Sequence, residues 1–293
     1  MNKPVSHILL GAILLLGMIF SFILYIDEQF KIKPTVIIEE LEDPGQTKQP
    51  PQATPGGEGK ILAALYNSGY LYHEGIDEGI NKDVLEELAR RMGMNLELHV
   101  MPRARIDNML KEGTLHMSVS AVETPERARY AWYVPYFAQK NDVLIRSEAG
   151  IINEEGLLHR RDIRVGIIRG YYYGEHYMAL IEKLKAKNRV VEAKDTEALY
   201  QMLKENWIQV TFNIASSYRY YFKTMDIENI SALDWAPGEA PLIRCLSLSK
   251  KYFDQEDVER FTRIINEMRN DGTLHKIFLR YLSEEEAQRM CDF

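Results

Sequence analysis

Residues 110–137 read LKEGTLHMSVSAVETPERARYAWYVPYF, and this stretch shows how the chain alternates between helix and strand. Its first residues complete a predicted helix at residues 105–112. Gly113 ends that helix, because glycine readily adopts the left-handed conformation of a helix C-terminus. Residues 115–120 (LHMSVS) then alternate apolar and polar side chains, which predicts a strand. A helix followed at once by such a strand is typical of α/β folds.

The same alternation extends towards the N-terminus. Residues 60–66 (KILAALY) and residues 96–101 are predicted strands. Between them, residues 81–93 place apolar side chains on one helical face and charged side chains on the other, which predicts an amphipathic helix. The order strand, helix, strand, helix, strand favours a mostly parallel sheet with helices on its faces.

A second set of alternating elements follows residue 160 and predicts a second α/β lobe. Its strands are expected at residues 163–168, 190–192 and 209–213, and its helices at residues 175–187 and 196–205.

Two further helical stripes lie near the C-terminus, at residues 258–268 and 274–282. Asp271-Gly272 separates them, and Thr273 is expected to cap the second helix. We expect both helices to cover a face of the first lobe.

The composition narrows the function classes. The 293 residues are 46% hydrophobic and carry 36 Lys and Arg against 43 Asp and Glu, which is typical of a globular protein and argues against nucleic-acid binding. Two cysteines are too few for a disulfide scaffold or a four-cysteine zinc site. Cys245 and Cys291 leave two interpretations open, one disulfide or two free thiols. The histidines lack metal-binding spacing and no nucleotide loop fits, so we expect no metal and no cofactor.

Residues 8–26 (ILLGAILLLGMIFSFILYI) carry no charge and, at about 1.5 Å per residue, can cross the roughly 30 Å hydrocarbon core of a membrane. A cleaved signal peptide is the alternative, but the run ends in large residues rather than in the small ones of a cleavage site. We expect residues 1–38 to be an anchor or signal segment with its flank, the anchor being favoured, and the bulk of the chain to be exported. Residues 39–59, rich in Pro, Gly and acidic side chains, are a predicted linker.

Four stretches resemble one protein family in the same order along the chain. They are GINKDVLEELARRM at residues 79–92, the opening stretch at residues 110–137, RDIRVGIIRGYYYGEHYM at residues 161–178, and MRNDGTLHKIFLRYL at residues 268–282. Together they are similar to the extracytoplasmic solute-binding proteins of family 3, the amino-acid-type periplasmic binding proteins.

This resemblance implies a two-lobed α/β periplasmic-binding-protein fold, type II-like, with two crossover strands at residues 141–146 and 242–249. Lobe 1 would contain residues 60–142 and 241–293, and lobe 2 would contain residues 143–240. The ligand would bind in the cleft between the lobes, which closes by a hinge motion. The position agrees with the general rule that ligands of open α/β sheets lie outside the carboxyl ends of the strands.

The resemblance also implies a set of ligand-binding residues, matched to the family's motifs one by one. They are Arg127 for a ligand carboxylate, Ser120 as a small polar contact, Tyr70 as an aromatic cover, Asn67 near the amino group, Gly170 and Tyr171 in an anion-attracting turn, and Asn213. Asn213 or Ile214 stands where the family has an Asp, and Val122 stands where it has a hydroxyl, which argues against standard α-amino-acid binding. A group of tyrosines around residues 171–173 and 218–221 indicates either a wider, more apolar ligand or a packed surface.

We therefore expect extracytoplasmic binding of a small polar solute, amino-acid-like or a carboxylate, as the substrate-binding component of an ABC-type transporter. The location would be the periplasmic face of the inner membrane, or the periplasm if the N-terminus is cleaved. The alternative is a degenerate binding fold that serves as a membrane-tethered sensor or as an interaction module of an envelope complex. An enzyme of the dehydratase kind, with Glu123 or Glu175 as proton donor, is a third hypothesis, and we expect the chain not to be an enzyme.

Overall fold

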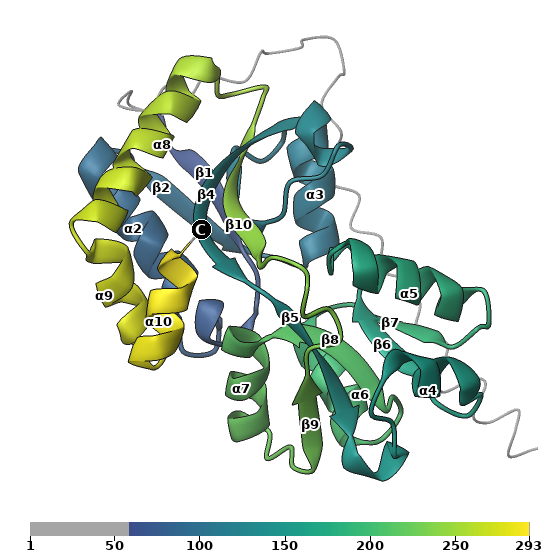
Figure 1. The fold of residues 1–293 in the computed structure, drawn as a ribbon. Coiled ribbons are helices and arrows are strands. Elements are labelled where there is room, and N and C mark those ends of the chain that lie inside the picture. Colours follow the sequence, from purple (N-terminus) through teal and green to yellow (C-terminus); the bar gives the residue numbers. More distant parts are fainter. Residues whose placement is uncertain (1–58, 293) are drawn as a thin grey trace, which may run out of the picture. The chain divides into compact units, whose positions relative to one another are not determined.

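The structure, a computed structural model, describes residues 59–292. The predicted anchor at residues 8–26 and the predicted linker up to residue 58 lie outside the described residues. Two five-stranded sheets with flanking helices organise the described part of the chain (Figure 1). They confirm the two α/β lobes that the sequence predicts, and we call them lobe 1 and lobe 2.

Lobe 1 draws its strands from both ends of the described chain. Its sheet has the order β2 (Leu96–Val100), β1 (Ile61–Leu65), β3 (Met117–Ala121), β10 (Leu242–Ser249) and β4 (Ala131–Gln139). Its helices are α2 (Ile80–Met92), α3 (Arg103–Glu112), α8 (Gln255–Asn270), α9 (Thr273–Leu279) and α10 (Glu284–Cys291), with the short 3-10 helices η1 (Gly69–Leu71) and η2 (Arg127–Arg129).

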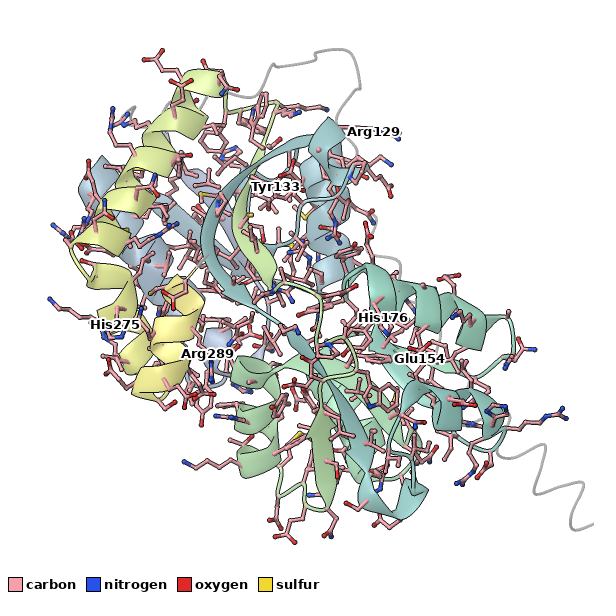
Figure 2. The ribbon with its side chains drawn as sticks, viewed as in Figure 1. Arg129, Tyr133, Glu154, His176, His275 and Arg289 are labelled. Carbon is pink, nitrogen blue, oxygen red and sulfur yellow. The ribbon has the colours of Figure 1, made fainter. Side chains whose placement is uncertain are left out.

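Lobe 2 is built from the middle of the chain. Its sheet has the order β7 (Val190–Ala193), β6 (Val165–Ile168), β8 (Val210–Ile214), β5 (Asn141–Arg146) and β9 (Ile230–Leu233). Its helices are α4 (Glu154–His159), α5 (Glu175–Lys185), α6 (Thr196–Lys204) and α7 (Ala215–Thr224), with the 3-10 helix η3 (Ser147–Ala149). The side chains of Glu154 of α4 and His176 of α5 lie 2.8 Å apart (Figure 2).

Both sheets are mixed rather than mostly parallel, which corrects one expectation. β1 pairs in parallel with β2 and β3, and β6 pairs in parallel with β7 and β8, as predicted. In contrast, β10 runs antiparallel to β3 and β4, and β5 runs antiparallel to β8 and β9. β5 and β10 enter their sheets from the other lobe, so no helical crossover forces them to be parallel to their neighbours.

The helices pack by the apolar stripes that the sequence predicts. In α2, Val84, Leu85 and Leu88 are fully buried, and Gly93 (φ 65°) ends the helix with its N–H bonded to the carbonyl of Ala89. The C-terminal helices cover lobe 1, as expected, because α8 and α10 lie against β4 and α9 lies against α2 (Figure 1).

Thr273 does not cap α9, contrary to the prediction. Gly272 (φ 76°) is the N-cap and Thr273 is the first helical residue. The carboxylate of Asp271 accepts a hydrogen bond from the Thr273 N–H (2.9 Å), while the Thr273 hydroxyl accepts one from Arg91 of α2 (2.9 Å). The threonine side chain therefore joins two helices instead of capping its own.

The chain crosses between the lobes twice, and the crossover strands predicted at residues 141–146 and 242–249 are β5 and β10. The first crossing lies between β4 and β5, and the second lies between β9 and β10. At the first crossing, the Lys140 ammonium donates to the Asp234 carboxylate (2.7 Å) and to the Ala236 carbonyl (2.9 Å) of the second. The two crossings are thereby tied to each other.

Two observations bear on alternatives left by the sequence. Cys245 is buried, Cys291 is half-buried, and both thiols are free in the structure. Over residues 59–292, none of the helices has both the length and the apolar character that a membrane crossing requires.

Candidate ligand-binding site

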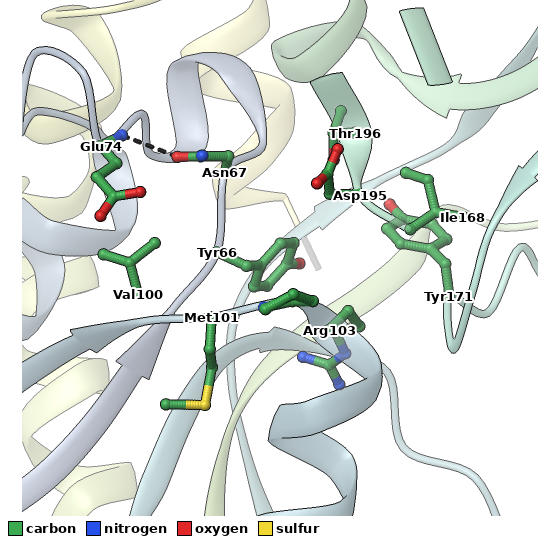
Figure 3. A pocket seen from close by; sticks show the side chains of 11 residues that line it. Tyr66, Asn67, Glu74, Val100, Met101, Arg103, Ile168, Tyr171, Asp195 and Thr196 are labelled. Atoms are coloured by element: carbon green, nitrogen blue, oxygen red, sulfur yellow. Dashed lines mark hydrogen bonds between the residues drawn. The ribbon is translucent and has the colours of Figure 1, made fainter. Parts of the chain in front are cut away.

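A cavity of about 160 Å³ lies between the two lobes (Figure 3). Its walls come mainly from the segments that follow β1 and β2 in lobe 1 and β6 and β7 in lobe 2. The lining residues are Tyr66, Asn67, Glu74, Val100, Met101, Pro102, Arg103, Ile168, Tyr171, Asp195 and Thr196. The cavity thus lies outside the carboxyl ends of parallel strands in both sheets, where α/β proteins bind ligands.

Arg103, at the start of α3, gives the cavity a buried positive charge. Its side chain is 4% exposed, donates to the carbonyl of Val119 (3.2 Å) and lies 3.1 Å from the carboxylate of Asp107. Burial is the largest single influence and lowers the pKa of Arg103, but the charge of Asp107 and those of the neighbouring tyrosines together outweigh it and raise the pKa above its ordinary value. The guanidinium also lies 5.6 Å from the ring centroid of Tyr66, so cation and aromatic ring share one wall.

Acidic side chains line the cavity as well. The backbone N–H of Glu74 donates to the side-chain oxygen of Asn67 (2.8 Å), which fixes this loop beside the cavity (Figure 3). In lobe 2, the carboxylate of Asp195 caps α6 by accepting a hydrogen bond from the N–H of Ala198 (2.8 Å). The cavity therefore carries both signs of charge: Arg103 is positive, and Glu74 and Asp195 are negative.

Tyr171, one of the predicted site residues, lines the cavity from lobe 2. Its ring centroid lies 4.7 Å from that of Tyr173 and 5.2 Å from the guanidinium carbon of Arg244. Burial raises the pKa of the Tyr171 hydroxyl, so the hydroxyl keeps its proton and can donate a hydrogen bond at neutral pH. Most of the neighbouring tyrosines do not face a ligand, since Tyr173, Tyr218 and Tyr221 are buried in the core of lobe 2.

Arg127 does not line the cavity. Its guanidinium bonds to the carboxylate of Asp107 (2.8 Å), to the carbonyl of Val122 (3.2 Å) and, across the lobes, to the carbonyl of Gly170 (2.8 Å). We call this set of bonds the arginine contact. Gly170 (φ 75°), also predicted as a site residue, takes part through its backbone. In this arrangement both residues hold the lobes together.

Ser120 is buried inside lobe 1 instead of facing the cavity. Its backbone is left-handed (φ 50°), and its hydroxyl meets the side-chain oxygen of Asn81 and the hydroxyl of Tyr136, each at 3.0 Å. Such a network positions the end of β3 but presents no free group to a solute.

Tyr70 is covered by lobe 2 and does not line the cavity. Its ring packs edge-to-face on Tyr220 of α7, with centroids 5.4 Å apart. The ring centroid of His73 lies 5.0 Å from that of Tyr220. Beside them, a Cβ added to Gly69 would come within 2.7 Å of the Ser217 carbonyl oxygen. We call Gly69, Tyr70, His73, Ser217 and Tyr220 the aromatic contact.

Asn213 is buried at the end of β8. Its side-chain oxygen accepts from the N–H of Ile214 (2.9 Å), and its amide nitrogen has no partner within the protein. Among the predicted residues, the structure therefore brings Asn67 and Tyr171 together in the cavity, and places the other five around it or behind it.

Sequence reasoning missed five polar or aromatic lining residues: Glu74 and Thr196, and three that share one feature, Tyr66, Arg103 and Asp195. Each of these three closely follows a strand: Tyr66 follows β1, Arg103 follows β2 and Asp195 follows β7. The rule that binding groups follow the carboxyl ends of strands could have identified them. By contrast, Glu123 and Glu175, considered as proton donors, are exposed and do not line the cavity.

Comparisons with known proteins agree with this geometry. The family model of bacterial extracellular solute-binding proteins, family 3, matches residues 63–284. No curated protein sequence matches the chain.

Three similar solved structures illustrate the fold. An ancestral arginine-binding protein bound to arginine has a TM-score of 0.64 at 17% identity, covering 77% of this chain and 99% of its own. EhuB in complex with hydroxyectoine has a TM-score of 0.64 at 19% identity, covering 78% and 91%. A histidine kinase sensor domain with similarity to periplasmic binding proteins has a TM-score of 0.63 at 15% identity, covering 76% and 96%.

Proposed function

We propose that the chain binds a small polar solute in the cavity between its lobes. The chain belongs to the bacterial extracellular solute-binding proteins of family 3, which supports this proposal. The solute is amino-acid-like or a carboxylate. Proteins similar in fold include an ancestral arginine-binding protein bound to arginine and EhuB in complex with hydroxyectoine, and these names describe binding rather than catalysis.

One observation carries the proposal: the cavity is lined by the strand ends of both lobes. A solute bound there contacts Tyr66 and Arg103 of lobe 1 together with Tyr171 and Asp195 of lobe 2, so that its binding favours the closed arrangement. At about 160 Å³ the cavity is smaller than the roughly 300–1,000 Å³ of drug-sized sites, which suits a solute of few heavy atoms.

The family and the N-terminal sequence support a proposal for the cellular role. We propose that the chain delivers its solute to an ABC-type transporter on the outer side of the inner membrane. The uncharged run at residues 8–26 would anchor it there, and residues 39–59 would give the lobes reach from the membrane surface.

The proposal is tested by thermal unfolding of the full-length chain in detergent solution, with amino acids, small carboxylates and hydroxyectoine added one at a time. A solute at 100 times its dissociation constant stabilises the folded state by about 2.7 kcal/mol. For a chain of this size, this corresponds to a rise in melting temperature of roughly 5–10 °C.

Two variants locate the binding. Met101→Trp puts a large side chain into the cavity wall and is expected to abolish the shift. Ile152→Trp, at a position that is 78% exposed in lobe 2, is the matched control and should keep it. A shift that survives Met101→Trp would move the solute out of the cavity. If no solute shifts the wild-type chain, the interaction-module alternative replaces this proposal.

A further inference from the structure

Arg244, on β10, is a buried guanidinium that hydrogen-bonds the Tyr171 side chain but has no carboxylate partner among residues 59–292. Arg244 is 2% exposed, and its Nε and Nη2 atoms have no hydrogen-bond partner within the protein. The ion pairs found among residues 59–292 do not include it, whereas Arg103 and Arg127 share the carboxylate of Asp107. A buried charge without an opposite charge beside it is costly, so a counter-charge is expected to come from outside the chain.

Arg244 lies behind one wall of the cavity. The next residue, Cys245, lies opposite Ala121, the last residue of β3, so Arg244 sits at the carboxyl end of that strand. Its guanidinium carbon lies 5.2 Å from the ring centroid of Tyr171, which itself lines the cavity. Tyr171 therefore separates a buried cation from the space in which the solute binds.

The unpartnered atoms of Arg244 point to the kind of group that it binds. Nε–H and Nη2–H lie side by side on one edge of a guanidinium and together match the two oxygens of a carboxylate. Two other arginines of this protein bind a carboxylate through the same edge. Arg90 donates from Nε and Nη2 to Glu87 at 2.8 Å each. Arg160 donates from the same atoms to Asp162 at 2.8 and 2.6 Å. In Arg244 this edge is free.

We propose that Arg244 is the anion anchor of the cavity and takes the carboxylate of the bound solute, while Arg127 serves as a clasp between the lobes. The inference rests on the proposed function and names the residue that selects for acidic solutes. Tyr171 lies over the guanidinium in the present structure, and its ring moves aside when the carboxylate enters.

The test uses the full-length chain in detergent solution and measures melting temperatures with and without each probe. The probes are pairs of a carboxylic acid and its carboxamide: L-arginine and L-argininamide, L-glutamate and L-isoglutamine, acetate and acetamide. The variants are Arg244→Met, Arg127→Met and, as a matched control, Arg189→Met. Arg189 is also buried with unpartnered Nη atoms, but it precedes β7 at the strand's amino end, away from the cavity.

We expect wild type to prefer an acid over its carboxamide at least tenfold. Arg244→Met should remove this preference, and Arg127→Met and Arg189→Met should keep it. Without any probe, Arg244→Met should melt at or above the wild-type temperature, since the variant removes a buried charge that lacks a counter-charge.

Two results would overturn the inference. One is a preference for the acid that survives in Arg244→Met and disappears in Arg127→Met, which would place the anion at Arg127. The other is a probe-free melting temperature of Arg244→Met well below wild type, which would make Arg244 a structural residue. If no probe stabilises wild type, the proposed function fails for these solutes, and the probe-free comparison alone decides on Arg244.

Discussion

The arginine contact and the aromatic contact both join lobe 1 to lobe 2, but they do so by different physical means. The arginine contact ends on a backbone carbonyl, that of Gly170, and depends on the charge of one guanidinium. The aromatic contact depends on shape, because the backbone at Gly69 lies directly against the backbone at Ser217 and the rings pack beside it. Charge and shape can be altered separately, and each alteration has its own signature.

The largest effect is expected from Gly69→Ala, which breaks the aromatic contact by steric clash. The new Cβ would meet the Ser217 carbonyl oxygen at 2.7 Å and the Tyr220 Cβ at 2.9 Å, and φ is +63°. We expect the lobes to open and solute affinity to fall at least tenfold, or about 1.4 kcal/mol. Titration measures the affinity, and small-angle X-ray scattering should show a larger radius of gyration.

Gly93→Ala is the matched control for this prediction. Its φ of +65° imposes the same left-handed strain, but its Cβ would meet nothing within 4 Å. Equal affinities for the two variants would show that strain alone, and not the contact with Ser217, accounts for the loss.

A smaller effect is expected from Arg127→Met, which removes the arginine contact. The side chain is 12% exposed, so its charge-assisted bonds are partly screened by solvent. We expect a loss of about 1 kcal/mol in the closed arrangement, roughly fivefold in affinity. Titration at low and high NaCl should show a weaker salt dependence than in wild type. Arg129→Met removes the same charge from an exposed neighbour. A similar loss in that control would assign the effect to net charge.

A still smaller effect is expected from Tyr220→Leu. This variant keeps the close approach of the Gly69 and Ser217 backbones but removes the Tyr220 ring from the aromatic contact. The edge-to-face pair with Tyr70 contributes about 0.5–1 kcal/mol, so affinity should fall roughly two- to fivefold. This loss should not change with NaCl, unlike that of Arg127→Met. Tyr220→Phe retains the ring and should bind as wild type does. A salt-dependent loss in Tyr220→Leu would show that the two contacts are coupled.

The smallest effect concerns the support beneath the aromatic contact. Asp142 of β5 accepts a hydrogen bond from the hydroxyl of Tyr218 (2.9 Å), which lies on α7 like Tyr220. Burial raises the pKa of Asp142, so the folded state binds its proton more tightly than the unfolded state does. Its contribution to stability is therefore present at low pH and is lost as pH rises through the raised pKa.

Melting temperatures measured from pH 4 to pH 7 test this prediction. Asp142→Asn should show a smaller decrease with rising pH than wild type. The exposed Asp226→Asn makes the same charge change and should follow wild type. A decrease in Asp142→Asn as large as in wild type would mean that Asp142 does not contribute to the pH dependence.

The regular elements could be predicted wherever burial leaves a period in the sequence. α2 alternates apolar and charged residues at helical spacing, and β3 is an uninterrupted buried run. In contrast, α7 reads ASSYRYYFKT, in which tyrosines occur on several faces, and it escaped prediction. β9 escaped because it is short and none of its residues is fully buried, so it shows no alternation.

The candidate site could be predicted only in part, because two of its expected residues are bound by partners far away in the sequence. Arg127 meets Asp107 and Gly170, and Tyr70 meets Tyr220. A sequence motif shows that an arginine is present, but not whether a carboxylate of the protein itself already pairs with its guanidinium. Asn67 and Tyr171 line the cavity because they closely follow strand ends, a position that the sequence does show.

The two chain crossings differ greatly in length. Lys140 alone separates β4 from β5, whereas residues 234–241 separate β9 from β10. A single residue offers two freely rotating backbone torsions but almost no extension. Any relative motion of the lobes is therefore a rotation about an axis near Lys140, and its bonds to Asp234 and Ala236 oblige the longer segment to turn with it. Of the two crossings, the one at Lys140 is therefore the shorter lever between the lobes.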